Sequence, residues 1–169
     1  MKISVSEISA EGLELELNEE VTAEILTVTS PVHSVLRIDR NGSEVFVRGV
    51  MDAVVELECG RCLKQFGMDV KSRLEVVYHP AGEIQREEHK ELKGEELDTG
   101  FYTDDTLDTV DILREQLLLS IPMKPLCSAD CKGICPVCGA DLSVEQCGCE
   151  VRETDPRLEV LKNLLKGKE

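Results

Sequence analysis

The stretch VHSVLRIDRNGSEVFVRGVMDAVVEL, residues 32–57, decides the fold. Val32, Ser34, Leu36 and Ile38 alternate with more polar neighbours before Asn41-Gly42, a pair that tolerates positive φ and marks a hairpin turn. After the turn, apolar residues or glycine fill every odd position, a period that buries one face of a strand. Because a straight strand of this length would be unusual, we expect Gly49 to mark a bulge or a bend.

The same period continues on both sides of this hairpin. Apolar side chains occupy the even positions of residues 66–78, with Ser72 as the exception, and therefore predict a third strand. Leucines at positions 13, 15 and 17 indicate another strand, whereas residues 19–26 are ambiguous between strand and helix. We therefore expect an antiparallel sheet built from residues 32–78 and the N-terminal strands.

Two helices are expected after the sheet. Residues 108–121 carry an apolar stripe at helical spacing, Asp108 or Thr109 can cap this helix, and Pro122 ends it. A last helix should begin at Asp155-Pro156, where the acid accepts from free N–H groups and proline suits the first turn. The stripes are Val110, Leu113, Leu117 and Ile121 in the first helix and Leu158, Leu161 and Leu165 in the second.

These elements predict an α+β fold with two parts. Residues 1–122 form an antiparallel sheet domain, a meander or a partly open barrel, with one packed helix at about 108–121. Residues 81–104 are acidic, contain three glycines and show no sustained period, so we expect a mobile insertion there. Residues 123–169 form a short Cys-rich, zinc-binding segment followed by the C-terminal helix.

Charge and hydropathy limit the classes of partner. The net charge is −15, and residues 81–111 alone contain eleven acids and three bases, which argues against broad, non-specific nucleic-acid binding. No segment approaches the roughly 20 apolar residues of a membrane helix, and the N-terminus lacks the apolar stretch of a signal peptide. We therefore expect a cytoplasmic protein with no membrane partner, in which thiols stay reduced and bind metal rather than form disulfides.

Eight cysteines predict zinc as the cofactor. Six lie within residues 127–149, and Cys135-Pro-Val-Cys138-Gly has the form of a zinc knuckle. The favoured site is Cys135, Cys138, Cys147 and Cys149, and the rival pairing brings in Cys127 and Cys131 instead.

The remaining pair, Cys59 and Cys62, lies at a predicted hairpin tip. Three readings are open for this pair: a redox dithiol, half of a zinc site completed by two cysteines of the C-terminal segment, or unligated thiols. A redox pair usually lies at a helix N-terminus, so we favour metal.

Catalysis is not expected. An all-thiolate zinc site is a poor Lewis acid without an open position, and the three histidines, His33, His79 and His89, lie far from the cysteines in sequence. The sequence contains no P-loop, Rossmann glycines or Ser/His/Asp set, so we predict no small-molecule substrate. Four basic residues on or beside the hairpin are either ordinary solvated positions or contacts to RNA or another partner: Arg61, Lys64, Lys71 and Arg73.

Four motifs in this order resemble the YceD family of bacterial proteins, which is named for large-subunit ribosomal RNA accumulation. They are CGRCL at 59–63, LLLSIPMKPLC at 117–127, DCKGICPVCGADL at 130–142 and DPRL at 155–158. The resemblance runs through most of the chain. It implies a factor needed for normal levels of large-subunit ribosomal RNA, with no established catalytic residues. Because some relatives lack the C-terminal cysteines, it also implies that zinc there is a stabiliser.

The sequence and the resemblance together predict a non-enzymatic ribosome-assembly factor that binds ribosomal RNA or a ribosomal protein. Two alternatives remain: a thiol-redox or metal-dependent enzyme that uses Cys59 and Cys62, and a zinc-ribbon adaptor between proteins.

Overall fold

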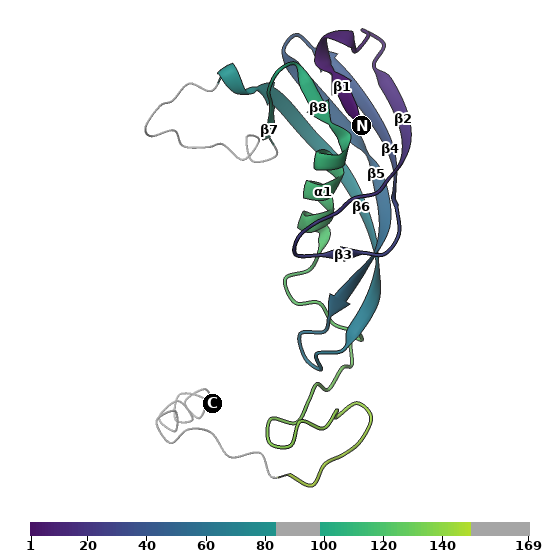
Figure 1. The fold of residues 1–169 in the computed structure, drawn as a ribbon, viewed down its shortest axis with the longest axis vertical. Coiled ribbons are helices and arrows are strands. Elements are labelled where there is room, and N and C mark those ends of the chain that lie inside the picture. Colours follow the sequence, from purple (N-terminus) through teal and green to yellow (C-terminus); the bar gives the residue numbers. More distant parts are fainter. Residues whose placement is uncertain (84–98, 150–169) are drawn as a thin grey trace, which may run out of the picture.

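The computed structural model describes residues 1–83 and 99–149. Figure 1 shows a long, curved sheet with one α-helix beside it and the cysteine segment beyond the end of its longest hairpin. The elements are β1 (Lys2–Ser4), η1 (Val5–Glu7), β2 (Leu13–Glu19), β3 (Thr27–Val28), β4 (Val32–Asn41), β5 (Glu44–Glu58), β6 (Gln65–Pro80), η2 (Ala81–Glu83), β7 (Thr99–Tyr102), β8 (Thr106–Asp108) and α1 (Thr109–Ser120).

The main sheet is open and mostly antiparallel. Its strand order is β2-β4-β5-β6-β7, with β3 paired to the far half of β5. The pair β6–β7 is parallel, and β1 and β8 form a separate two-stranded ribbon. The prediction of an antiparallel sheet with one packed helix is confirmed, and the sheet is open and does not close into a barrel.

The β4–β5 hairpin turns one residue later than predicted. Asn41 pairs with Glu44, so the two turn residues are Gly42 and Ser43. Gly42 has a φ of 65°. A positive φ at the first turn position matches the right-handed twist of the strands, and glycine adopts it without steric cost.

The odd positions of β5 face the core, as the period predicts. Val45, Val47, Met51, Ala53 and Val55 are all buried. Pairing with both neighbouring strands passes through Gly49 without interruption, so of the two predicted features, a bulge or a bend, the bulge is excluded. A Cβ at Gly49 would lie 2.2 Å from the carbonyl oxygen of Val35, so the glycine allows β4 and β5 to approach closely.

Helix α1 covers the sheet as predicted. The Asp108 carboxylate accepts a hydrogen bond from the Val110 N–H at 3.0 Å and caps the helix. Leu113 and Leu117 are fully buried among residues of β4, β5 and β6, and each stabilises the fold by about 1.5–3 kcal/mol. Ile112, outside the predicted stripe, is buried in the neighbouring cluster with Tyr78.

The segments that were hardest to assign have mixed outcomes. Residues 20–26 form neither strand nor helix, with one bridge between Ala23 and Leu26. Most of the predicted acidic insertion lies outside the described residues, but its end, Thr99–Tyr102, is the strand β7. The predicted C-terminal helix also lies outside the described residues, and the predicted domain boundary at residue 122 stays a prediction. None of the described helical segments has the length and apolar character that a bilayer crossing requires.

Candidate metal centres

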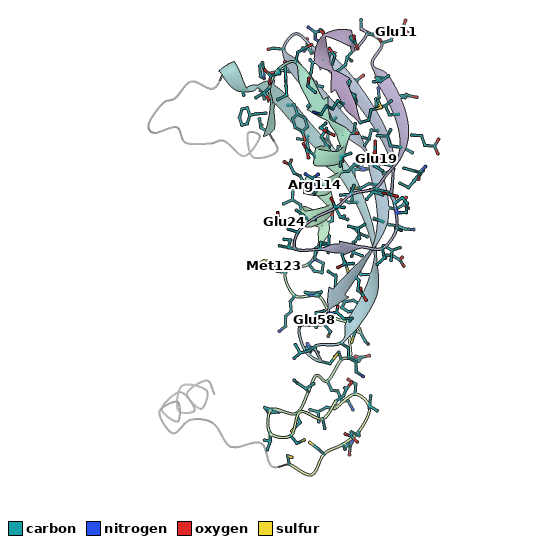
Figure 2. All side chains as sticks on the ribbon, viewed as in Figure 1. Glu11, Glu19, Glu24, Glu58, Arg114 and Met123 are labelled. Atoms are coloured by element: carbon teal, nitrogen blue, oxygen red, sulfur yellow. The ribbon has the colours of Figure 1, made fainter. Side chains whose placement is uncertain are left out.

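The eight thiols form two groups of four. In each group the sulfur atoms all lie within 4.8 Å of one another. Figure 2 shows sulfur atoms gathered beyond Glu58, at the far end of the β5–β6 hairpin. The first centre is Cys59, Cys62, Cys127 and Cys131, and the second centre is Cys135, Cys138, Cys147 and Cys149.

The spacing of the sulfur atoms fits a tetrahedral metal ion. In the first centre, the Sγ atoms of Cys59 and Cys131 are 3.8 Å apart, and those of Cys62 and Cys127 are 3.6 Å apart. A zinc ion with Zn–S distances of about 2.3 Å places its sulfur ligands about 3.8 Å from one another. All eight cysteines are free thiols in this structure. Four soft thiolates at this spacing are therefore a donor set suited to zinc.

Each centre begins with the same backbone turn. In the first, the Cys59 N–H donates to the carbonyl of Lys64 at 2.9 Å, and the Leu63 N–H donates to that of Cys59 at 3.0 Å. In the second, the Cys135 N–H donates to the carbonyl oxygen of Ala140 at 2.8 Å, and the Gly139 N–H donates to the carbonyl oxygen of Cys135 at 2.9 Å. The two Cys-x-x-Cys motifs are thus copies of one zinc-knuckle turn.

The residue after each knuckle has a left-handed backbone. Gly139 has a φ of 75° and Leu63 has a φ of 58°. Glycine adopts this conformation freely, whereas a leucine there costs about 1–2 kcal/mol. Glycine at 139 is therefore visible in the sequence as a knuckle signal, while leucine at 63 hides the equivalent turn.

The local electrostatics favour the thiolate form of one cysteine in each centre. The backbone amides of Cys127 and Cys62 lower the pKa of the Cys59 thiol to about 6, and those of Cys138 and Val137 lower that of Cys135 to about 6. The neighbouring thiol of Cys62, together with burial, raises the pKa of Cys127 to about 12. Four crowded thiols therefore do not all ionise unaided, and a bound divalent cation would stabilise all of them as thiolates.

The first centre joins the sheet to the C-terminal segment. Two of its ligands lie at the tip of the β5–β6 hairpin, and the other two follow α1 by several residues. Cys59, Cys62 and Cys131 are buried and pack with Phe66 and Leu126. Among the three readings of Cys59 and Cys62, this is the arrangement of a metal site completed by two cysteines of the C-terminal segment. It is a hairpin loop rather than a helix N-terminus, where redox pairs usually lie.

Arg61 contributes to this junction. Its Nη1 donates to the carbonyl oxygen of Cys131 at 2.7 Å, and its own carbonyl accepts from the Ile134 N–H at 3.3 Å. Gly133 has a φ of 79°, and a Cβ there would lie 3.0 Å from the Arg61 carbonyl oxygen. Arg61 therefore holds the hairpin to the segment between the two centres.

Lys64 also bridges the two parts. Its Nζ lies 2.5 Å from a carboxylate oxygen of Asp141, whose side chain is only 17% exposed. Asp141 raises the pKa of Lys64, and Lys64 in turn lowers the pKa of Asp141. A substitution of Arg61 or Lys64 would thus change the junction as well as the surface.

Lys71 and Arg73 lie elsewhere on the sheet. Both are exposed on the outward face of β6. In the register with β5, Lys71 lies opposite Asp52 and Arg73 lies opposite Val50. Seven residues of strand separate Lys64 from Lys71, about 23 Å along β6. The structure therefore does not bring the four predicted contact residues into one patch.

Arg73 instead belongs to an outward-facing group that sequence reasoning missed. It lines a shallow groove on the sheet with Arg37 and Arg48, around the half-exposed side chains of Val35 and Val50. Arg37 is paired with Glu14 at 2.8 Å, and Arg48 lies 3.6 Å from Glu75. Acidic residues lie between these arginines on the same face of the sheet. The sequence of each strand taken alone therefore does not indicate a basic face.

Comparison with known proteins identifies the family. The family model described as "Large ribosomal RNA subunit accumulation protein YceD" matches residues 47–165. These residues contain most of β5, all of β6 and α1, and all eight cysteines. No solved structure gave a significant match.

Several bacterial proteins are similar in sequence. An uncharacterised Mycobacterium tuberculosis protein, Rv2926c, is 31% identical over 130 residues, which are 77% of this chain and 60% of that protein. An uncharacterised Mycobacterium leprae protein, ML1660, is 28% identical over 69% of this chain and 51% of its own length. The uncharacterised Bacillus subtilis protein YlbN is 29% identical over 90% of this chain and 85% of its own length. The match thus spans less than two thirds of the mycobacterial relatives and most of the Bacillus relative.

Proposed function

The chain belongs to the YceD family of large ribosomal RNA subunit accumulation proteins, and from this premise we propose that it is a non-enzymatic, zinc-stabilised factor for large-subunit assembly. It acts by binding ribosomal RNA or a ribosomal protein. The proposal places it in the cytoplasm, where ribosomes assemble and where thiols stay reduced.

The observation that carries this proposal is the pair of complete thiol sets. Each centre offers four sulfur atoms, which fill the coordination sphere of a tetrahedral zinc ion. Catalytic zinc keeps a position open for water or substrate, and thiolate ligands reduce its strength as a Lewis acid. Closed sites of this type support a structural role for the metal.

The position of the first centre indicates what the metal stabilises. Its ligands come from the β5–β6 hairpin and from the segment after α1, so one ion would fix that segment against the sheet. The contacts of Arg61 and Lys64 act across the same junction. Two zinc ions would therefore present the hairpin tip and the cysteine segment as one rigid binding surface.

A cellular experiment tests the function. Cells that lack the chromosomal gene should show a lower ratio of large-subunit to small-subunit ribosomal RNA, and the wild-type gene should restore it. Cys62→Ser should fail to restore the ratio if the clamped arrangement is required. A ratio that does not change on deletion would refute the proposal.

A binding experiment tests direct contact with RNA. Lys71→Glu with Arg73→Glu should weaken association with large-subunit ribosomal RNA and reduce its salt slope by roughly 0.7 for each lost phosphate contact. Lys2→Glu with Arg114→Glu makes the same change of net charge on β1 and α1, away from the cysteine segment, and is the matched control. An equal loss of RNA affinity in both double variants would show that the change of net charge, and not a contact at Lys71 or Arg73, weakens binding. No RNA binding by the wild-type protein would leave a ribosomal protein as the partner.

The zinc-ribbon adaptor is the second candidate. It shares the metal centres but has a protein partner with no role in ribosome assembly. Deletion would then leave the ribosomal RNA ratio unchanged while the zinc content of the purified protein stayed the same.

A further inference from the structure

A cleft at the other end of the sheet is not used by the proposed function. A cavity of about 400 Å³ opens between β7, β8 and the first half of α1. A second cavity of about 430 Å³ adjoins it between β6 and α1, and both are lined by Tyr78, Ile112 and Glu115. We call these two cavities beside α1 together the acidic cleft.

The lining of the acidic cleft is mostly negative: among the described residues, carboxylates outnumber its two cations, Lys2 in the first cavity and Arg73 in the second. Among the described residues, Lys2 is the one cation that lines the first cavity. Four carboxylates line it as well: Asp104, Asp108, Asp111 and Glu115. Asp111 is paired with Arg114, and Asp108 caps the helix. Within residues 1–83 and 99–149, the carboxylates of Asp104 and Glu115 have no hydrogen-bond or ion-pair partner.

Tyr78 supplies an independent indication of a ligand. Its side chain lines both cavities, yet the residue is only 6% exposed. A Cβ at Gly100 would lie 2.4 Å from the Tyr78 ring, so β7 holds the ring in place. Its hydroxyl has no hydrogen-bond partner among the described residues and is not one of their buried unpartnered polar atoms, so a ligand in the cavity can reach it. Burial, followed by Glu115 and Asp111, raises the pKa of Tyr78 to about 12 and keeps the phenol neutral.

Aromatic side chains complete the wall of the cleft. Phe101 is 54% exposed although it is a large apolar residue, and it lines the cavity beside Tyr102. An aromatic face attracts a cation held within about 6 Å of its centre. Carboxylates, a free phenol oxygen and an exposed ring are the groups that together recognise an ammonium or a guanidinium.

We propose that the acidic cleft binds a lysine or arginine side chain of an extended, basic polypeptide partner. The cation pairs with Glu115 and Asp104, donates a hydrogen bond to the Tyr78 hydroxyl oxygen, and lies against Phe101. The two adjoining cavities leave room for the chain beside the bound residue. The net charge of −15 speeds the encounter with a basic segment and disfavours RNA at this end.

An NMR titration tests this site. The probe is a short peptide in which arginine and lysine alternate with glycine, and its control replaces them with citrulline and acetyl-lysine. Only the charged peptide should shift the backbone amides of Gly100, Phe101 and Asp104 in a saturable manner. Tyr78→Phe keeps the net charge and the ring, and should weaken binding by about tenfold, because a hydrogen bond to a charged group is lost.

A matched variant separates recognition from general attraction. Glu115→Gln should weaken peptide binding, whereas Glu56→Gln, which removes an equal charge from the exposed outward face of β5, should not. Equal weakening by both variants, or unchanged binding in Tyr78→Phe, would overturn the proposal. Unchanged spectra away from the cleft show that each variant is folded. The inference does not rest on the proposed function, since peptide binding and ribosomal RNA levels are measured separately.

Discussion

Loss of the first centre should cost more stability than loss of the second. Cys62→Ser removes one ligand of the first centre with little change of volume, and Cys138→Ser does the same to the second. Each variant should bind about one zinc ion per chain where the wild-type protein binds about two, since four thiolates fill one site. The two losses differ in the length of chain that each ion closes.

The magnitude follows from the sequence separation of the ligands. Cys62 and Cys127 are 65 positions apart, and Cys59 and Cys131 are 72 apart. Closing a loop of this length restricts the unfolded chain by about 4 kcal/mol in the chain-entropy model, and a metal clip acts in the same way. For a chain of this size this corresponds to a fall in Tm of about 8–16 °C. The second centre closes eight residues between Cys138 and Cys147, which gives about 3 kcal/mol and leaves the sheet untouched.

Zinc per chain is measured by elemental analysis after reducing purification, and unfolding of the sheet by far-ultraviolet circular dichroism. Cys62→Ser should lower the unfolding midpoint of the sheet, and Cys138→Ser should not. A wild-type protein with less than about 0.2 zinc per chain would refute the assignment of both centres. A Cys62→Ser variant that loses one zinc ion without a change in midpoint would show that the first centre does not clamp the sheet.

Three further outcomes are expected from single positions. Gly49→Ala should destabilise the fold by about 1–3 kcal/mol in urea unfolding, because the new Cβ would lie 2.2 Å from the Val35 carbonyl oxygen; an unchanged midpoint would contradict this close approach. Leu63→Gly should raise the midpoint of urea unfolding slightly, because it relieves about 1–2 kcal/mol of left-handed backbone strain and adds only roughly 0.5–1 kcal/mol of entropy to the unfolded chain. A lower midpoint would show that contacts of the leucine side chain stabilise the fold by more than the strain costs. The hydrogen bonds of His33 to Glu16 and Asp52 raise its pKa, so its contribution to stability is present below pH 6.5 and is lost as pH rises through the folded-state pKa. An NMR titration should show that Asp52→Asn lowers the pKa of His33, and an unchanged value would exclude that partner.

The longest strands could be predicted because their signal is local. Strands β5 and β6 keep a strict period of two over most of their length, and the turns between strands carry glycine or paired cysteines. Strand β7 could not be predicted, since it has only four residues and lies at the end of an acidic stretch. What makes it a strand is parallel pairing with Val77–Pro80, a tertiary contact that no local pattern reports.

The division of the cysteines was only half visible. Short spacing gave Cys135, Cys138, Cys147 and Cys149 as one set, and these four sulfur atoms do lie together. The partners of Cys59 and Cys62 stayed open, because they depend on where the chain returns after α1. That return is fixed by contacts distant in sequence, including the Gly60 N–H bond to the Pro125 carbonyl at 2.8 Å.

Contacts distant in sequence also explain why the roles of Arg61 and Lys64 at the junction could not be predicted from the sequence. Arg61 and Lys64 read as exposed cations on a hairpin, which is a common signature of phosphate contact. Their partners, the Cys131 carbonyl and the Asp141 carboxylate, lie far along the chain. The acidic cleft was hidden for the same reason, since Tyr78 and Glu115 meet only when α1 packs against β6.

The β5–β6 hairpin connects the two ends of the molecule. The first metal centre lies at the tip of this hairpin, next to the pair Glu58–Gln65, while Tyr78 pairs with Val45 near its opposite end. Thirteen residues of strand separate Gln65 from Tyr78, about 43 Å along β6. Figure 2 shows Glu58 and Glu11 toward opposite ends of the sheet. A sheet paired without interruption along this hairpin is stiff, so it holds the metal-bound end and the acidic cleft at a fixed separation. Under the functions proposed above, this hairpin would be the spacer between the partner at the metal-bound end and the basic segment in the acidic cleft. Zinc at the first centre would extend the rigidity of the hairpin into the cysteine segment.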